Sequence, residues 1–164
     1  MSELGRVNCA IIGSRGLVAQ RYLQRMINHN WLVPVSVIGS ASTVGMKISE
    51  LPWSLDEKRP ELSDITVKGL DDLDRLITEL KAAQVQIIFS AIPDDIAIKV
   101  EKDLAKAGFV VISHALVHRM DNDIPLVIPD VNPSHLSILK SQNFGNGYLI
   151  SCSNCMVVPI ALTL

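Results

Sequence analysis

Residues 7–19 read Val7-Asn8-Cys9-Ala10-Ile11-Ile12-Gly13-Ser14-Arg15-Gly16-Leu17-Val18-Ala19, and this stretch decides the fold. Its first part is a short run with apolar residues on both faces, as expected for a buried strand of a parallel sheet. A glycine turn follows, and from Leu17 apolar residues recur at helical spacing to about Asn30. The stretch therefore predicts a strand, a turn and a helix in direct succession.

The same alternation continues along the chain. Short apolar runs predict strands, and stretches with apolar residues three and four apart predict helices. The predicted strands are 32–39, 65–68, 85–91 and 109–113, and the predicted helices begin at Asp71 or Asp72 and at Pro93. Strands that alternate with helices need right-handed crossovers, so the pattern predicts an α/β fold with a doubly wound parallel sheet.

After residue 113 the pattern is weaker. We expect a short apolar stretch at 125–129, a helix capped by Ser134 and reaching Ser141, and a strand at 148–151. The last eight residues, 157–164, are apolar and carry no capping glycine or charged tail. They predict an element that the chain end interrupts, and we expect one dinucleotide-binding domain, apparently truncated, over residues 1–164.

Composition narrows the classes of function. The chain of 164 residues has 15 Lys and Arg against 17 Asp and Glu, which leaves no surplus of positive charge for nucleic acid. No apolar run reaches the roughly 18 to 20 residues of a membrane span. Three cysteines are too few for a secreted disulfide framework, so we expect a protein of the reducing cytoplasm.

The glycine turn has the spacing of a nucleotide site. Gly13 would allow a tight turn, Gly16 a close approach of a phosphate, and Ala19 a close contact between helix and sheet. The backbone N–H groups at the start of the helix would then bind a pyrophosphate. The alternative is a glycine turn that only joins a strand to a helix.

The second predicted strand is followed by hydroxyl side chains. An NAD site usually has Asp or Glu there to bind the ribose hydroxyl, but none occurs before Glu50. A 2′-phosphate would meet no repulsion and could pair with Arg15 or Lys47. The loop therefore favours NADP, and the alternative is a serine-rich surface loop without a ligand.

Cys155 lies between a predicted strand and the apolar final segment, where its sulfur would be near a helix N-terminus. Such a place favours the nucleophilic thiolate. Most single cysteines are instead small buried apolar residues. Cys152 and Cys155 alone cannot supply the four ligands of a structural zinc site, so we expect no metal, and a redox pair would need a thioredoxin-like strand pattern.

Several motifs together resemble one family. They are Gly13-x-x-Gly16-x-Val18-Ala19-Gln20-Arg21, Phe89-Ser90-Ala91-Ile92-Pro93-Asp94-Asp95-Ile96-Ala97, His118-Arg119-Met120-Asp121-x-Asp123-Ile124-Pro125-Leu126, Ile128-Pro129-Asp130-Val131-Asn132-Pro133-Ser134-His135-Leu136 and Asn154-Cys155. In this order they resemble the aspartate-semialdehyde dehydrogenases of the archaeal and fungal type. The resemblance covers nearly the whole chain and implies the N-terminal, NADP-binding part, a Rossmann-like domain, while the family's second domain for substrate binding and dimerisation is absent.

The resemblance implies an activity in the synthesis of lysine, threonine and methionine. Cys155 would attack the aldehyde of aspartate semialdehyde, hydride would pass to NADP, and inorganic phosphate would cleave the thioester to aspartyl phosphate. Asn154 would help to hold the oxyanion. Arg119 would bind phosphate, and its alternative is a surface salt bridge.

The resemblance also implies which residues contact NADP. They are Gly13, Ser14, Arg15, Gly16, Leu17, Val18, Ser40, Ser42, Thr43, Ser90 and Ala91. Arg15 stands where the family usually has Thr, and Thr43 where an arginine often meets the NADP phosphate. These departures leave the preference between NADP and NAD open.

Other departures concern the substrate. Met156 replaces a usual Ser or Thr, His114 replaces a usual Asn in the substrate pocket, and the family's catalytic histidine and substrate-binding glutamine and arginine are absent. His114 or His118 could act as a substitute acid or base. Three alternatives stay open: a malonyl-CoA reductase, a non-catalytic NADP-binding module and a redox role for Cys152 and Cys155. The chain is also expected to associate into a homo-oligomer or with a longer homologue.

Overall fold

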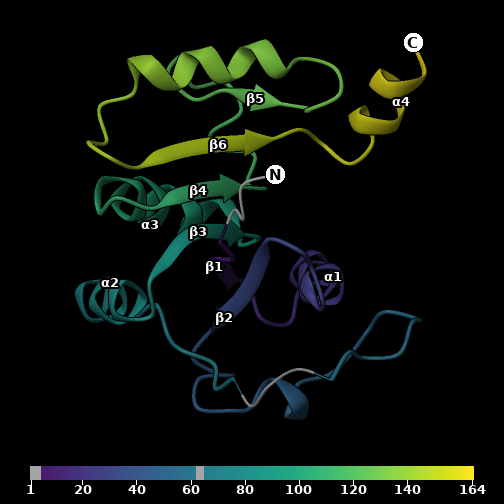
Figure 1. Cartoon of the computed structure of the whole chain (residues 1–164), viewed down its shortest axis with the longest axis vertical. Coiled ribbons are helices and arrows are strands. Elements are labelled where there is room, and N and C mark those ends of the chain that lie inside the picture. Colours follow the sequence, from purple (N-terminus) through teal and green to yellow (C-terminus); the bar gives the residue numbers. More distant parts are fainter. Residues whose placement is uncertain (1–4, 62–64) are drawn as a thin grey trace. The chain divides into compact units, whose positions relative to one another are not determined.

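The computed structural model describes residues 5–61 and 65–164 (Figure 1). The chain consists of two compact units, Met1–Ala91 and Ile92–Leu164. Among the described residues, each unit contains three strands that pair in parallel, together with helices. The predicted α/β class with parallel strands is confirmed. The extent of a single dinucleotide-binding domain over residues 1–164 stays a prediction.

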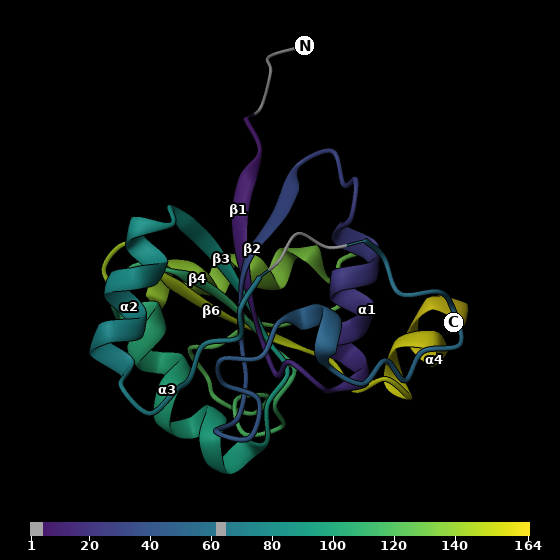
Figure 2. The same cartoon turned by 90° about the horizontal axis from the view of Figure 1, so that it is seen from below.

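The first unit is built around strand β1 (Val7–Ile12), which pairs with β2 (Leu32–Ile38) on one side and β3 (Val85–Ser90) on the other. Helices α1 (Leu17–Met26) and α2 (Leu73–Ala82) lie on opposite sides of these strands, as Figures 1 and 2 show. A strand covered on both faces must be apolar on both. Ala10, Ile11 and Ile12 are accordingly fully buried.

Two details of this unit differ from the sequence prediction. Helix α1 ends at Met26 rather than near Asn30, because the backbone is already extended at Ile27, with ψ of 130°, and is left-handed at Asn28, with φ of 57°. The predicted strand 65–68 forms only two isolated bridges, Ile38 with Lys68 and Lys47 with Thr66. The cap of α2 is confirmed, since the Asp72 side chain accepts a 2.9 Å hydrogen bond from the Arg75 N–H.

The second unit is built around strand β6 (Tyr148–Cys152), which pairs in parallel with β4 (Val110–Ser113) and β5 (Leu126–Val127). Helix α3 (Asp94–Lys106) packs on β4 and β6 and buries Ala97 and Leu104. Helix α4 (Val157–Thr163) follows β6 and buries none of its residues.

The segment before β6 forms a 3₁₀ helix, η2 (Pro133–Ser141), and the prediction of Ser134 as its cap is wrong. Asn132 is the N-cap and Pro133 is the first helical residue. The Asn132 side chain accepts from the Ile128 N–H at 2.7 Å and donates to the Leu126 carbonyl at 2.9 Å. These bonds fix the entry to the helix at Asn132.

The described helices are all too short or too polar to cross a membrane.

Candidate functional site

The turn after β1 is held in a conformation that requires Gly13. Its φ is +112°, a region that side-chain-bearing residues rarely adopt, and its N–H donates to the Ile38 carbonyl at 2.9 Å. A Cβ atom on Gly13 would also collide with the Ala91 carbonyl oxygen. Gly13 therefore serves the fold by bringing the turn close to the end of β3.

Gly16 is different, because nothing in the surrounding chain requires a glycine there. A Cβ on Gly16 would meet the Gly13 oxygen at 3.4 Å, which is ordinary contact. Gly16 is the exposed N-cap of α1 and offers no side-chain cap, and the first turn of the helix carries no acidic residue. The first N–H groups of a helix lack intrahelical acceptors, so the start of α1 fits the pyrophosphate of a dinucleotide.

The other predicted nucleotide contacts divide into exposed and buried groups. Arg15, Leu17, Val18, Ser40 and Ser42 are exposed, and the two serine hydroxyls lie 3.0 Å apart. Those side chains are accessible to a ligand.

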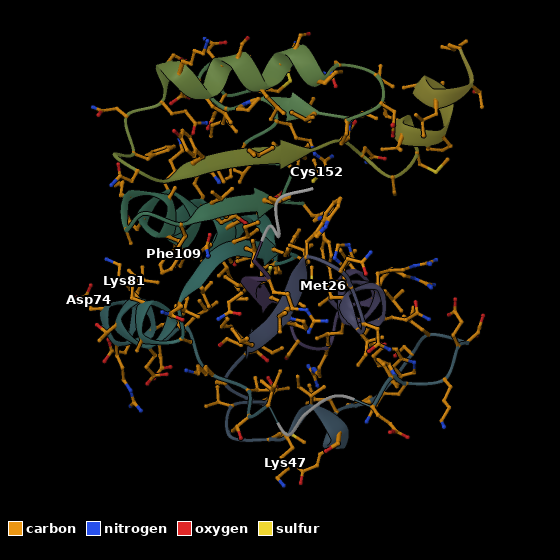
Figure 3. All side chains as sticks on the ribbon, in the orientation of Figure 1. Met26, Lys47, Asp74, Lys81, Phe109 and Cys152 are labelled. Atoms are coloured by element: carbon orange, nitrogen blue, oxygen red, sulfur yellow. The ribbon has the colours of Figure 1, made fainter. Side chains whose placement is uncertain are left out.

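Two of the buried residues among the predicted contacts, Ser14 and Thr43, stabilise the loop after β2. Ser14 and Thr43 are buried with their hydroxyls 3.2 Å apart, and Thr43 also donates to the Ser40 carbonyl at 2.9 Å. Ser90 is fully buried, while Ala91 is half-buried and donates its N–H to the Ile12 carbonyl. Lys47 is exposed just before the short helix η1 (Ile48–Glu50), as Figure 3 shows. Contacts of these residues with NADP stay predictions.

Gln20 is a structural partner of the glycine turn that sequence reasoning missed. Its side chain is 2% exposed, donates to the Arg15 carbonyl at 2.9 Å and accepts from the Ser54 N–H at 2.8 Å. It therefore ties the turn to the segment around residue 54. The sequence signal that could have identified Gln20 is its position, as a polar residue, on the apolar face of the predicted amphipathic helix.

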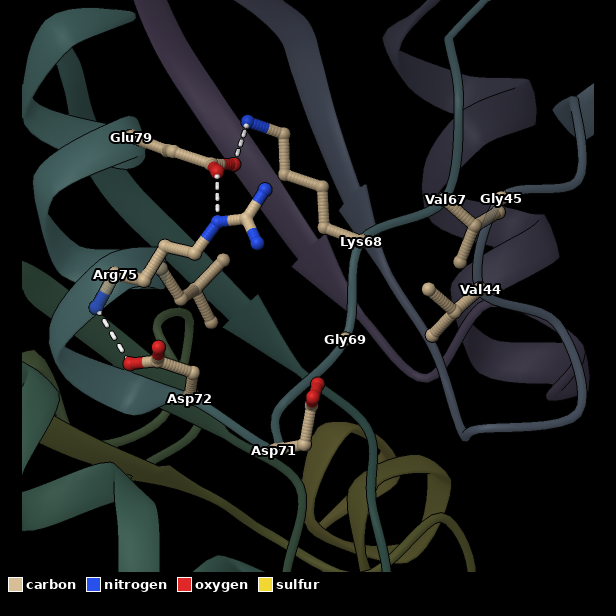
Figure 4. A pocket seen from close by; sticks show the side chains of 10 residues that line it. Val44, Gly45, Val67, Lys68, Gly69, Asp71, Asp72, Arg75 and Glu79 are labelled. Carbon is tan, nitrogen blue, oxygen red and sulfur yellow. Dashed lines mark hydrogen bonds and ion pairs between the residues drawn. The ribbon is translucent and has the colours of Figure 1, made fainter.

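A cavity of about 250 Å³ lies between the loop after β2 and the start of α2 (Figure 4). Val44 and Leu76 give it apolar surface, and an ion-pair network of Lys68, Glu79 and Arg75 lines one side. Sequence reasoning singled out none of these residues as ligands. Its first lining residues, Val44 and Gly45, directly follow the Ser40–Thr43 segment in the sequence.

Cys155 is exposed and lies between β6 and α4. The Asn154 side-chain oxygen accepts from the Met156 N–H at 2.8 Å, and the Asn154 carbonyl accepts from Val157 and Val158. Asn154 thus forms the turn that starts α4, and its side-chain oxygen is 3.8 Å from the Cys155 sulfur. The predicted place of the thiol just before a helix is confirmed, whereas the catalytic roles stay predictions.

Arg119 joins the carboxyl ends of two strands. Its Nε donates to the Cys152 carbonyl at 3.1 Å and its Nη2 donates to the His114 carbonyl at 3.0 Å. Figure 3 shows Cys152 at the end of β6. These bonds hold the guanidinium beside Cys152, which precedes Cys155 by three residues. The predicted contact of Arg119 with phosphate and its alternative, a surface salt bridge, both stay untested.

The surroundings of Arg119 affect two titratable groups. Burial, followed by the charge of Arg119, lowers the pKa of His114 from its ordinary 6.5. Burial raises the pKa of the Cys152 thiol, and Arg119 opposes that shift. The lowered pKa favours the neutral form of the His114 imidazole. Among the described residues, no three His, Cys, Asp or Glu side chains are grouped to hold a metal ion.

Comparison with known proteins identifies the family. The family described as semialdehyde dehydrogenase, NAD binding domain, matches residues 8–139. The aspartate-semialdehyde dehydrogenase of Archaeoglobus fulgidus is 35% identical over 163 residues, which are 97% of this chain and 46% of that relative. The malonyl CoA reductase (NADP) of Metallosphaera sedula is 32% identical and matches 96% of this chain and 43% of its own length.

A solved structure extends the comparison. The aspartate semialdehyde dehydrogenase of Candida albicans, crystallised with NADP, superposes with a TM-score of 0.79 and 26% identity, covering 96% of this chain and 46% of that chain. This chain thus spans less than half the length of the relatives it matches, and it aligns with their N-terminal part. The doubly wound, Rossmann-like fold and the predicted resemblance are both confirmed. The chain belongs to the semialdehyde dehydrogenase family, whose NAD binding domain it matches over residues 8–139.

Proposed function

We propose that this chain is the nucleotide-binding and cysteine-bearing part of a cytoplasmic, NADP-dependent aspartate-semialdehyde dehydrogenase. The reaction converts aspartate semialdehyde, phosphate and NADP to aspartyl phosphate and NADPH, for the synthesis of lysine, threonine and methionine. The observation that carries the proposal is the exposed Cys155 thiol, which follows β6 on a turn made by Asn154. We also propose that the chain associates with a second copy of itself or with a longer homologue.

The chain's own residues have defined roles in this reaction. The Cys155 sulfur bonds to the aldehyde carbon, and the tetrahedral oxyanion is stabilised by Asn154 and neighbouring N–H groups. NADP, when bound, supplies the hydride acceptor. The resulting thioester is cleaved when phosphate oxygen bonds to the acyl carbon and the thiolate leaves. Arg119, held by two carbonyls, orients phosphate with its remaining N–H donors.

The exposed start of α1 binds the pyrophosphate of NADP, with Gly16 allowing the close approach. Arg15 and Lys47 supply positive charge for the 2′-phosphate, and the exposed Ser40 and Ser42 hydroxyls supply hydrogen bonds. The neighbouring cavity of about 250 Å³ offers Val44 and Leu76 to an aromatic base.

A thermal-unfolding titration with NADPH and, in parallel, NADH tests the cofactor. A ligand at about 100 times its dissociation constant stabilises a folded protein by roughly 2.7 kcal/mol, which gives a shift of several degrees. We expect NADPH to raise the unfolding temperature more than NADH. Equal curves with and without either nucleotide would overturn nucleotide binding by this chain, and a larger shift with NADH would reverse the cofactor assignment.

The similarity to malonyl CoA reductase favours a second candidate substrate. Both substrates would acylate Cys155, aspartyl phosphate with loss of phosphate and malonyl-CoA with loss of CoA. Mass spectrometry of the chain after incubation with each compound distinguishes them by the added mass. We expect an aspartyl thioester that Cys155→Ser abolishes and Cys152→Ser retains. A malonyl adduct alone selects the second candidate, and nucleotide binding without either adduct selects the non-catalytic module.

A further inference from the structure

The second unit contains a buried ionisable pair that the proposed reaction does not use. His118 Nε2 lies 3.2 Å from Glu101 Oε2, and the two side chains are 1% and 0% exposed. The contact is at ion-pair distance without the alignment of a hydrogen bond. On its other side His118 Nδ1 lies 3.3 Å from Asp121, which pairs with Lys102 at 3.0 Å.

A buried glutamate such as Glu101 is not expected on a helix face whose only role is to pack against the core. It lies on the buried face of α3 among Ala97, Val100, Leu104 and Ala105, where apolar residues fill the core. Removing two charges from water is costly, and apolar residues of similar volume are often as stable. A carboxylate at this position therefore calls for a role that an apolar side chain cannot fill.

Helix α3 contacts the segment His114–Asp121, here called the arginine loop, at three points. Asp94 accepts hydrogen bonds from the Leu116 and Val117 N–H groups at 2.7 and 3.3 Å. Glu101 meets His118, and Lys102 meets Asp121. One face of a single helix thus fixes the start, the middle and the end of the loop.

The arginine loop is connected in turn to the cysteine segment. Arg119 directly follows His118, and its Nε donates to the Cys152 carbonyl at the end of β6. We propose that Glu101 is a positioning residue, which through His118 holds Arg119 on the carbonyls of His114 and Cys152 and so orients the Cys155 segment. The link to Cys155 chemistry rests on the proposed function, whereas the position of Arg119 does not.

The pair also gives the loop a predicted pH dependence. Burial alone would lower the pKa of His118, but Glu101 and Asp121 outweigh it and raise the pKa above the ordinary 6.5. The other charged or titratable groups around the pair are Lys102, Arg119 and His114. The positive charge on His118 is therefore present below its raised pKa and is lost as the pH rises through that pKa.

The test measures hydrogen exchange of the Arg119 Nε–H by NMR on the 164-residue chain. The Arg75 Nε–H, bonded to Glu79 at 2.9 Å in the first unit, is the internal reference. We expect Glu101→Gln to raise the Arg119 rate about tenfold relative to Arg75. Asp103→Asn, the matched change at an exposed position of α3, should leave the ratio unchanged. Equal ratios in the two variants would overturn the proposal.

A pH series on the unaltered chain provides the same test without a substitution, in case Glu101→Gln does not fold. The ratio of Arg119 to Arg75 exchange should rise about tenfold as the His118 NMR signal titrates, and a constant ratio overturns the proposal.

Acylation of Cys155 by aspartyl phosphate should slow about tenfold in Glu101→Gln and stay normal in Asp103→Asn. If the chain is never acylated but Glu101→Gln raises the ratio of Arg119 to Arg75 exchange, the proposed reaction fails while the positioning role stands. Normal acylation with a changed ratio would overturn the link to Cys155.

Discussion

The three cysteines differ in what surrounds each sulfur, and this sets the order in which they react. Cys155 is exposed, Cys152 is half-buried with a raised pKa, and Cys9 is fully buried. Burial raises the pKa of Cys9 to about 11, with a backbone hydrogen bond at Val33 opposing it. We predict that iodoacetamide modifies Cys155 first, then Cys152, and Cys9 only after unfolding. Peptide mass spectrometry over time shows the order, and early labelling of Cys9 would contradict it.

Gly13 and Gly16 are predicted to differ in what an added methyl group does. Gly13→Ala should lower the free energy of unfolding by about 1–3 kcal/mol, because of its positive φ and the collision with Ala91. Gly16→Ala should leave stability nearly unchanged and reduce the NADPH-induced shift, because the methyl group occupies space for phosphate. Urea unfolding with and without NADPH measures both effects. Gly5→Ala, at an exposed position with no atom within 4 Å, is the control, and equal behaviour of Gly13→Ala and Gly16→Ala would contradict the distinction.

At the scale of elements, helix α1 is attached to the segment that follows η1 through Gln20. Gln20→Ala removes the acceptor of the Ser54 N–H and the donor to the Arg15 carbonyl. We predict a loss of about 1–3 kcal/mol in the free energy of unfolding, with faster amide exchange at Ser54. Gln24→Ala, on the same helix and bonded to Arg21, is the matched control and should cost less. If both variants exchange alike at Ser54, the link between α1 and this segment is absent.

At the scale of the whole molecule, the cluster on α3 predicts how stability depends on pH. The raised pKa of His118 contributes stability at low pH that is lost as the pH rises above 6.5 and through that pKa. Burial would raise the pKa of Asp121, but Lys102 and His118 lower it below 3.8, so its contribution is lost as the pH falls through the lowered value. Between these limits both contacts stabilise the fold.

The measurement is the difference in free energy of unfolding between the unaltered chain and His118→Gln at several pH values. We predict that the difference shrinks as the pH rises past the His118 pKa. His29→Gln, a change of the same kind in the first unit, controls for general effects of losing a histidine. A difference that does not vary with pH would contradict the role of His118.

The sequence by itself determined the alternation of β1, α1, β2, α2, β3, α3 and β4, the glycine turn and the place of Cys155 before a helix, but it wrongly added a strand at 65–68. These features rest on signals between near neighbours, such as the cap of Asp72 on the Arg75 N–H or the positive φ that favours Gly13. The local signal was misread at η2, where Pro133 is the first helical residue and Asn132 the N-cap, so that Ser134 lies inside the helix.

Only the tertiary structure decided which residues support the candidate site. Gln20 meets Ser54 across 34 positions, and Arg119 meets Cys152 across 33. Thr43 faces Ser14 rather than solvent, and Glu101 faces His118. Such contacts depend on how strands and helices pack, because burial leaves a polar group only the partners that packing brings to it. The sequence pattern specifies which face of an element is buried, and the packed fold specifies what that face meets.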